Sequence, residues 1–261
     1  MTAVDFAAFV DRLATASGEA ILPFFRTSLG VEDKAKGAGF DPVTAADKAG
    51  ESVMRALIRK TFPEHGIIGE EHGDFGLDAE YVWVLDPIDG TRSFITGLPI
   101  WGTLIGLTRR GRPCFGLMHQ PFVGETFSGD GASARYRGPG GERRLRTRSC
   151  ARLGDAMLMS TSPSMFAEAE RAAFDRVAAD VRQTRWGGDC YAYAMLAAGH
   201  LDLVVEADLK PFDIVALIPI VEGAGGVITT WDGGSAADGG RIVAAGDRRL
   251  HEAALERLSR L

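Results

Sequence analysis

Short apolar runs alternate with helix-like segments along the second half of the chain, and this alternation limits the fold more than any other sequence feature. The pattern predicts a sheet covered by helices, that is, an α/β fold. We expect strands at 157–160, 181–186, 201–206 and 226–231. We expect helices at 164–179, 189–198, 213–223 and 247–260.

The first half begins with two amphipathic helices. Apolar side chains recur at helical spacing over 3–28 and again over 45–61, which indicates helices that each pack one face on a core. Thr44 and Asp47 suit the start of the second helix, as its cap and as a capping-box residue. Strands that predict an antiparallel sheet follow at 66–69, 81–85, 100–108, 112–119, 125–128 and 143–147, with a short helix at 93–98.

The boundary between the halves, near residue 150, carries no linker-like composition. We therefore expect an N-terminal α+β half at 1–150 and a C-terminal α/β half at 151–261 that share one interface and form one catalytic unit. A cleft between such halves is a favoured place for a ligand.

Composition and charge argue against several partners. The apolar and charged fractions, 46% and 25%, are those of a soluble globular protein. A net charge of -6 without a basic stripe disfavours nucleic acid. No apolar run approaches the roughly 20 residues of a membrane span, and no signal peptide is visible. The three cysteines lack metal-site spacing, which is typical of a reduced, cytoplasmic protein.

Residues 83–94, WVLDPIDGTRSF, place two carboxylates where a buried strand is expected to stop. Asp86 and Asp89 can converge on a hard cation such as Mg2+, which uses one or two carboxylates together with substrate phosphate. The N–H groups of Gly90 and Thr91 can hold a phosphate. The alternative is a turn that merely caps a strand.

Other acidic residues follow strands or begin helices, and each alone is more typical of a cap or a surface acid. Only one of two adjacent glutamates at a strand end is expected to face a shared site. The acids in question are Glu70, Glu71, Asp189, Glu206, Asp208 and Asp213.

The polar segment 34–40 is interpreted either as a mobile loop or as a flap that reaches a phosphate.

Four motifs, in this order, resemble the inositol-monophosphatase-like family of metal-dependent phosphatases. They are VTAAD (43–47), GEEHG (69–73), DPIDGT (86–91) and FDIVALIPIVEGAGG (212–226). The resemblance implies a layered αβαβα sandwich, two or three Mg2+ per site with Mn2+ as a substitute, and a homodimer. It also implies hydrolysis of a small phosphate monoester.

The same resemblance implies roles for single residues. Asp86 would bridge two cations, and Thr91 would orient the attacking water with Asp47 as its partner and Glu70 as a further catalytic residue. The amides of Gly90 and Thr91 would hold the phosphate. The metal ligands implied are Glu70, Asp86, the carbonyl of Ile88, Asp89 and Asp213, and the substrate-binding residues are Asp189, Glu206 and Arg92.

The stretches DGTRSFITGLP (89–99), WGTLIGL (101–107) and WGGDCYAYAMLAAGHLDLVVE (186–206) look most like the histidinol-phosphate phosphatase branch. Arg92, Ser93 and Phe212 depart from the family's commonest form. The branch implies histidinol phosphate as substrate, in histidine biosynthesis, with Asp189 and Glu206 opposite its ammonium group. An inositol-1-phosphate or broad sugar-phosphate phosphatase is the alternative, and a non-catalytic binding or regulatory protein is the other.

Overall fold

The computed structural model describes residues 6–27, 31–33 and 42–259, with the backbone alone for 31–33 and 42–44. The interpretations of segment 34–40 and of the Thr44 side chain as a cap therefore lie outside what is described.

The N-terminal half is built on a seven-stranded sheet in the order β3-β4-β5-β6-β7-β8-β9. Neighbours from β4 to β9 are antiparallel, as expected, but β3 runs parallel to β4. The chain between them returns along the outer edge of β3, where Phe75 bridges Ile67. The strands are β3 (Gly66–Gly69), β4 (Tyr81–Asp89), β5 (Gly102–Arg109), β6 (Arg112–Gln120), β7 (Glu125–Gly129), β8 (Ala134–Gly138) and β9 (Gly141–Arg144).

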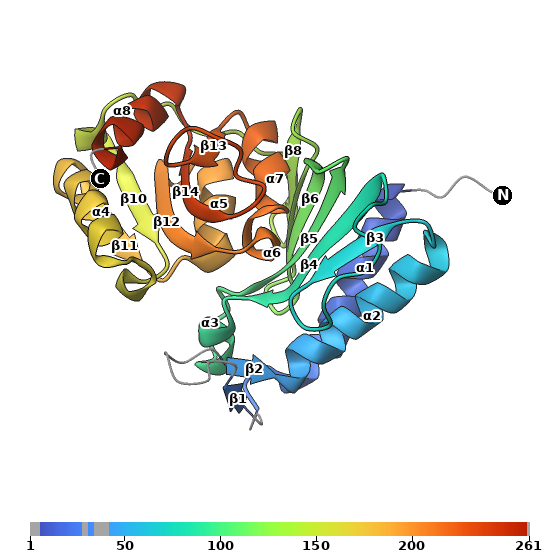
Figure 1. Cartoon of the computed structure of the whole chain (residues 1–261). Coiled ribbons are helices and arrows are strands. Elements are labelled where there is room, and N and C mark those ends of the chain that lie inside the picture. Colours follow the sequence, from blue (N-terminus) through green and yellow to red (C-terminus); the bar gives the residue numbers. More distant parts are fainter. Residues whose placement is uncertain (1–5, 28–30, 34–41, 260–261) are drawn as a thin grey trace.

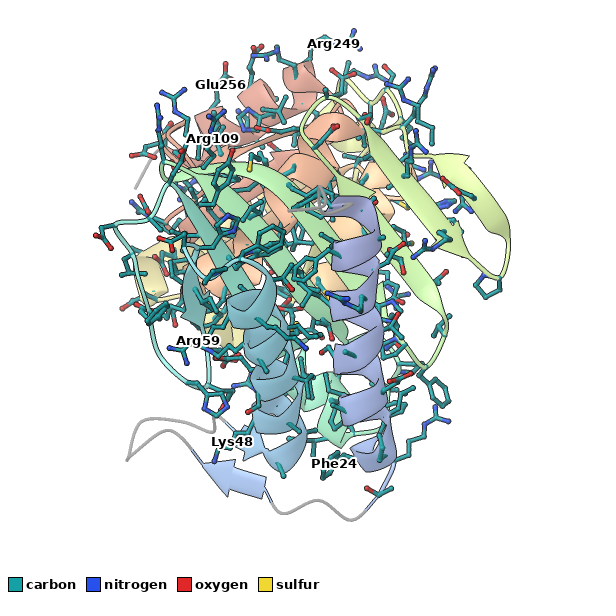
Figure 2. The ribbon with its side chains drawn as sticks, turned by 90° about the vertical axis from the view of Figure 1, so that its right-hand side faces the viewer. Phe24, Lys48, Arg59, Arg109, Arg249 and Glu256 are labelled. Atoms are coloured by element: carbon teal, nitrogen blue, oxygen red, sulfur yellow. The ribbon has the colours of Figure 1, made fainter. Side chains whose placement is uncertain are left out.

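Two helices, α1 (Phe6–Ile21) and α2 (Ala45–Thr61), cover one face of this sheet (Figures 1 and 2). Their apolar faces are buried with Trp83 of β4. The first helix is shorter than expected because Pro23 ends it in a 3-10 turn, η1 (Leu22–Phe24), where the proline offers no N–H. The short strands β1 (Val31–Asp33) and β2 (Pro42–Thr44) pair with each other antiparallel.

The C-terminal half holds a mixed sheet in the order β11-β10-β12-β14-β13, as expected. The central strand pair β10 and β12 is parallel, whereas β14 runs antiparallel to both of its neighbours. The strands are β10 (Met157–Ser160), β11 (Gln183–Trp186), β12 (Leu203–Leu209), β13 (Val227–Thr230) and β14 (Gly240–Ala245).

Helices α4 (Glu168–Asp180) and α8 (Arg248–Leu258) pack on the outer face of the mixed sheet. Helices α5 (Asp189–Ala197) and α7 (Leu217–Gly223) fill the layer between the two sheets (Figure 1). The five layers are those of the αβαβα sandwich that the sequence predicts. The remaining helical turns are η2 (Leu153–Asp155), η3 (Pro163–Met165), α3 (Thr91–Ile95) and α6 (Pro211–Ile214).

Three further predicted elements need correction. β4 does not stop at Asp86 but continues to Asp89, with a register shift against β5 between the two aspartates; an irregularity of this kind accommodates Pro87. The helix expected at 213–223 is divided into α6 and α7, because Pro219 gives no N–H to the carbonyl of Val215. The short helix expected at 93–98 begins at Thr91.

Among residues 6–27 and 42–259, none of the helices is long and apolar enough to cross a bilayer.

Candidate active site

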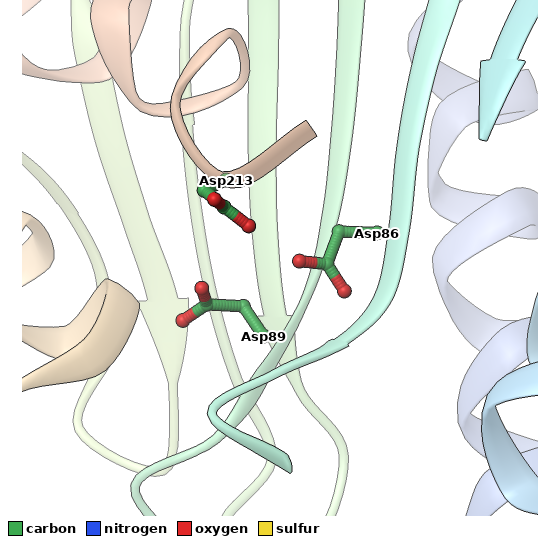
Figure 3. Close-up of side chains that lie close together, drawn as sticks. All are labelled: Asp86, Asp89 and Asp213. Atoms are coloured by element: carbon green, nitrogen blue, oxygen red, sulfur yellow. The ribbon is translucent and has the colours of Figure 1, made fainter. Parts of the chain in front are cut away.

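Three aspartates converge where the end of β4 meets α6, between the two halves of the molecule. Asp86 and Asp89 come from β4 and Asp213 from α6, and each offers an oxygen within 4.8 Å of the others. Figure 3 shows the three carboxylates pointing toward one another. Folding thus brings acids from the two halves of the chain into one cluster.

A backbone amide holds each carboxylate in place. Asp86 Oδ1 accepts the N–H of Ile88 at 3.0 Å, within the irregular end of β4. Asp89 Oδ2 accepts the N–H of Cys190 at 2.6 Å, from the first turn of α5. Asp213 Oδ2 accepts the N–H of Lys210 at 2.6 Å, at the start of α6. These bonds orient the carboxylates before any ligand arrives.

The electrostatics of the cluster favour a cation. Burial raises the pKa of Asp86 well above its usual range, and the charges of Glu70, Asp89, Asp213 and Asp47 raise it further. Burial and the charge of Asp189 likewise raise the pKa of Asp89. Burial raises the pKa of Asp213 to about 7. Carboxylates that resist ionisation together are stabilised as anions when a cation shares the site.

The donor set fits a hard divalent cation. The oxygens present are carboxylates and a nearby carbonyl, which are the ligands that Mg2+ takes. Among the described residues, the carboxylates of Asp86, Asp89 and Asp213 form the group close enough to share one ion. Glu70, directly after β3, is half-buried and near enough that its charge raises the pKa of Asp86 and Asp213.

Ile88, Thr91 and Asp47 lie around this cluster. Thr91 donates its hydroxyl to the carbonyl of Ile88 at 3.2 Å, so the predicted carbonyl ligand and the predicted water-orienting residue are neighbours. Asp47 is buried in the first turn of α2. The charge of Asp47 contributes to the raised pKa of Asp86.

Gly90 forms the start of α3 in a left-handed conformation, with φ of 85°. A Cβ at this position would lie 3.0 Å from Asp189 Oδ2, so glycine is required by conformation and by space. The amides of Gly90 and Thr91 therefore lie at a turn that approaches the opposite half of the molecule closely.

Asp189 reaches this turn from the C-terminal half. Its Oδ2 accepts the Ser93 hydroxyl at 2.7 Å, and its own N–H donates to Thr161 Oγ1 at 3.0 Å. Burial raises the pKa of Asp189, while Ser93 and the charge of Arg92 lower it. Its φ of 44° is unusual for a residue other than glycine and marks a locally strained position.

Of the two acids of β12, Glu206 is buried and Asp208 is exposed. Glu206 is 2% exposed, and its two oxygens accept the Thr161 N–H at 2.8 Å and the Tyr193 hydroxyl at 2.9 Å. Burial raises the pKa of Glu206 to about 7. Asp208 is exposed and pairs with Lys210 at 2.8 Å, so it stays outside the buried cluster. Arg92 is exposed on α3.

Sequence reasoning missed the groups that orient the acids. These include Ser93, Thr161 and Tyr193, and also the buried Glu51 of α2. The burial of Glu51 could have been predicted from its spacing. It lies four residues after Asp47, on the helix face that carries the apolar Met54 and Ile58. The remaining partners depend on contacts between distant segments.

The fold is a layered α/β sandwich, and its carboxylate cluster has the donor set that suits a divalent cation. The chain belongs to the inositol monophosphatase family, whose model matches residues 4–261. It is therefore a phosphatase of the phosphoric monoester hydrolase class, in a family that is generally metal-dependent.

Known proteins resemble the chain over nearly its whole length. It is 45% identical to the chloroplastic bifunctional phosphatase IMPL2 of Arabidopsis thaliana, covering 97% of this chain and 75% of that protein. It is 35% identical to a histidinol-phosphatase of Mycobacterium tuberculosis, covering 84% and 85% of the two chains. A solved inositol monophosphatase from Zymomonas mobilis is 42% identical, with a TM-score of 0.86 and 98% of each chain covered.

Proposed function

We propose that the protein is a Mg2+-dependent phosphomonoesterase that hydrolyses L-histidinol phosphate to L-histidinol and phosphate, in histidine biosynthesis. The observation that carries this proposal is the position of Asp189, whose carboxylate lies beside Gly90 and close enough to raise the pKa of Asp89. A phosphate held at Gly90 would bring its organic group next to this anion. A relative at 35% identity is named histidinol-phosphatase.

In the reaction, water adds to phosphorus, the ester P–O bond breaks, and the leaving alkoxide takes up the proton that the water loses. Glu70, Asp86, Asp89, Asp213 and the Ile88 carbonyl would hold the cations, which would neutralise charge on the phosphoryl oxygens and make the water easier to deprotonate.

The remaining groups act on water and phosphate. The amides of Gly90 and Thr91 hold the phosphoryl oxygens at the start of α3. The Thr91 hydroxyl, which donates to the Ile88 carbonyl in the structure, turns to orient the attacking water, with Asp47 as its partner. Positioning and electrostatics of this kind supply most of the catalysis in phosphoryl transfer.

The charge around Asp189 supports a cationic leaving group. The charge of Asp189 raises the pKa of Glu206, so a positive group nearby relieves their repulsion. Asp189 is half-buried, whereas Glu206 is enclosed by Thr161 and Tyr193. We therefore assign the direct contact with the ammonium group to Asp189 and a longer-range electrostatic role to Glu206. We also propose that Arg92, which is exposed on α3, contributes to substrate binding.

The Asp189→Asn variant tests this assignment. It should lower kcat/KM for histidinol phosphate by about 10- to 100-fold, because a hydrogen bond to a charged group contributes about 1.5–3 kcal/mol. It should change kcat/KM for inositol 1-phosphate less than about threefold, because that substrate has no ammonium group. The Asp208→Asn variant, at an exposed acid paired with Lys210, is the matched control. Equal losses on both substrates would contradict the role of Asp189.

An inositol-1-phosphate or broad sugar-phosphate phosphatase is the second candidate, favoured by the inositol monophosphatase of Zymomonas mobilis at 42% identity. A purely regulatory protein is disfavoured, because such a protein has no need of the carboxylate cluster.

We further propose two or three Mg2+ per site, replaceable by Mn2+, and a cytoplasmic homodimer, all on the strength of the family.

A further inference from the structure

Glu51 is a fully buried acid of α2 whose carboxylate faces the segment that follows β3. Its Oε2 accepts the N–H of Glu71 at 2.7 Å, and its Oε1 accepts the N–H of His72 at 3.1 Å. Oε1 also accepts from Arg55 Nε at 2.6 Å, one helical turn further on. Three donors from two segments thus converge on one carboxylate.

Other residues of α2 also contact the segment 69–73. Arg55 also donates to the carbonyl of Gly73, and the His72 Nε2 atom lies 2.9 Å from Ser52 Oγ. Gly69 allows the close approach, because a Cβ there would overlap the Glu51 carboxylate. Helix α2 therefore packs closely against Gly69 and forms hydrogen bonds with residues 71–73.

Glu70 lies between two fixed stretches of backbone. On one side, Gly69 is paired with Leu85 of β4. On the other side, the amides of Glu71 and His72 are fixed by Glu51. Because β3 and β4 run parallel with Gly69 opposite Leu85, the half-buried Glu70 follows β3 beside the position of Asp86. Its charge raises the pKa of Asp86 and Asp213.

We propose that Glu51 is a positioning residue that fixes the backbone after Glu70 and thereby holds the Glu70 carboxylate toward the cation site. The proposal rests on the proposed metal role of Glu70. A carboxylate is required, because each of its oxygens receives a backbone N–H and one also receives Arg55. Glutamine has a single acceptor oxygen, so its NH2 group would face a donor in either orientation.

The test is a calorimetric titration of the full chain with Mg2+ alone, in a double-mutant cycle. Glu51→Gln should weaken Mg2+ binding by about 10- to 100-fold, the usual effect of removing a residue that orients a metal ligand. The same substitution in the Glu70→Gln background should change the affinity less than about twofold, because the positioned ligand is already gone. Asp175→Asn, which removes an exposed i,i+4 partner of Arg171 in α4, is the matched control.

Two results would overturn the proposal: unchanged Mg2+ affinity in Glu51→Gln, or equal losses in both backgrounds. If Glu51→Gln does not fold, Arg55→Lys replaces it, since lysine keeps the charge but loses the Nε donor to Glu51 and the contact with Gly73. A folded Arg55→Lys protein with wild-type affinity would then reject the positioning role.

The wild-type titration separates this proposal from the proposed function. Mg2+ binding without release of phosphate from any ester would reject the proposed reaction and leave the double-mutant cycle valid. A wild-type chain that binds no Mg2+ would overturn the metal site and the positioning role together.

Discussion

Asp213 combines two tasks at one side chain. One oxygen caps the start of α6 through the Lys210 N–H, and the carboxylate also faces Asp86 and Asp89. An asparagine can keep the cap, because its amide oxygen also accepts a hydrogen bond, but it brings no negative charge. Substitution at this position therefore separates charge from local structure.

For Asp213→Asn we expect phosphatase activity to fall more than about 100-fold, because losing a ligand should exceed the effect of losing a residue that orients one. Without metal, the variant should be at least as stable as the wild type, because one member of a repelling cluster has become neutral. Phosphate-release assays and thermal unfolding in EDTA measure the two effects. A metal-free variant with a markedly lower Tm would show that Asp213 is mainly structural.

At the residue scale, the sequence predicts the acids more readily than their partners. Asp86, Asp89 and Asp213 lie in motifs with local turn chemistry, and the structure brings them together. The Cys190 amide that holds Asp89 lies 101 positions away, so only tertiary structure can supply it. Glu206 was expected at a strand end, but β12 continues past it to Leu209, so Glu206 lies within the strand. Its bonds to Thr161 and Tyr193 could not be foreseen from spacing.

At the scale of elements, α7 packs directly on the seven-stranded sheet. Gly116 of β6 and Gly129 of β7 make this possible, because a Cβ at either position would overlap backbone atoms of the helical segment, at Ala216 and at Pro219. The same segment carries α6, and with it Asp213. Packing at these glycines therefore sets how close Asp213 comes to β4.

Gly116→Ala should lower the free energy of unfolding by about 1–3 kcal/mol, the usual cost of overpacking a core. It should also weaken Mg2+ binding, since α6 must shift. Denaturant titration and calorimetry provide the two readouts. Gly154→Ala is the control, because a Cβ there meets nothing closer than 3.9 Å, and its effect should stay within about 0.5 kcal/mol. A Gly116→Ala protein as stable as this control would contradict the packing described.

Periodicity predicts most helices and strands but misses β8 and β14, as well as the three-residue strands β1 and β2. β8 exposes every second residue, including Arg135 and Arg137, and is too short and polar to stand out from its turns. β14 follows a glycine-rich stretch. It pairs with β12, which lies far away in the sequence, and with β13, from which a loop separates it. The break between α6 and α7 was readable from Pro219 but was not predicted.

At the scale of the whole molecule, folding assembles a set of acids that repel one another. The folded-state pKa values of Asp213 and Glu206 are raised to about 7, and those of Asp86 and Asp89 are raised as well. A raised carboxylate pKa stabilises the fold at low pH, and this stability is lost as pH rises through the folded-state value. Burial lowers the pKa values of His65, His119 and His251. These histidines make the fold more stable as pH rises, which opposes the effect of the acids, but only below about pH 7.

We therefore expect the metal-free protein to become less stable between pH 7 and pH 8. For each proton that the folded state binds in excess of the unfolded state, the free energy of unfolding falls by about 1.4 kcal/mol per pH unit. Each kcal/mol lost lowers Tm by about 2–4 °C. Mg2+ should remove most of this pH dependence by replacing the protons. Thermal unfolding at both pH values, with EDTA or with Mg2+, measures this. A metal-free Tm that is flat or rises over this interval would contradict the electrostatic account.

The meeting of the two halves was predictable in outline, since the sequence shows no linker near residue 150 and places acids in both halves. The contacts that create the site were not predictable. They pair Gly90 with Asp189 and Asp89 with the start of α5, and such contacts depend on how α5 packs between the two sheets.

The central claim is that this carboxylate cluster performs metal-dependent hydrolysis of a phosphate monoester with a cationic leaving group. The most direct measurement is phosphate release from histidinol phosphate and from inositol 1-phosphate, side by side, with Mg2+ and with EDTA. We expect turnover only with Mg2+ and a clear preference for histidinol phosphate. Preference for inositol 1-phosphate would contradict the substrate assignment, and turnover of either ester in EDTA would contradict the metal-dependent mechanism.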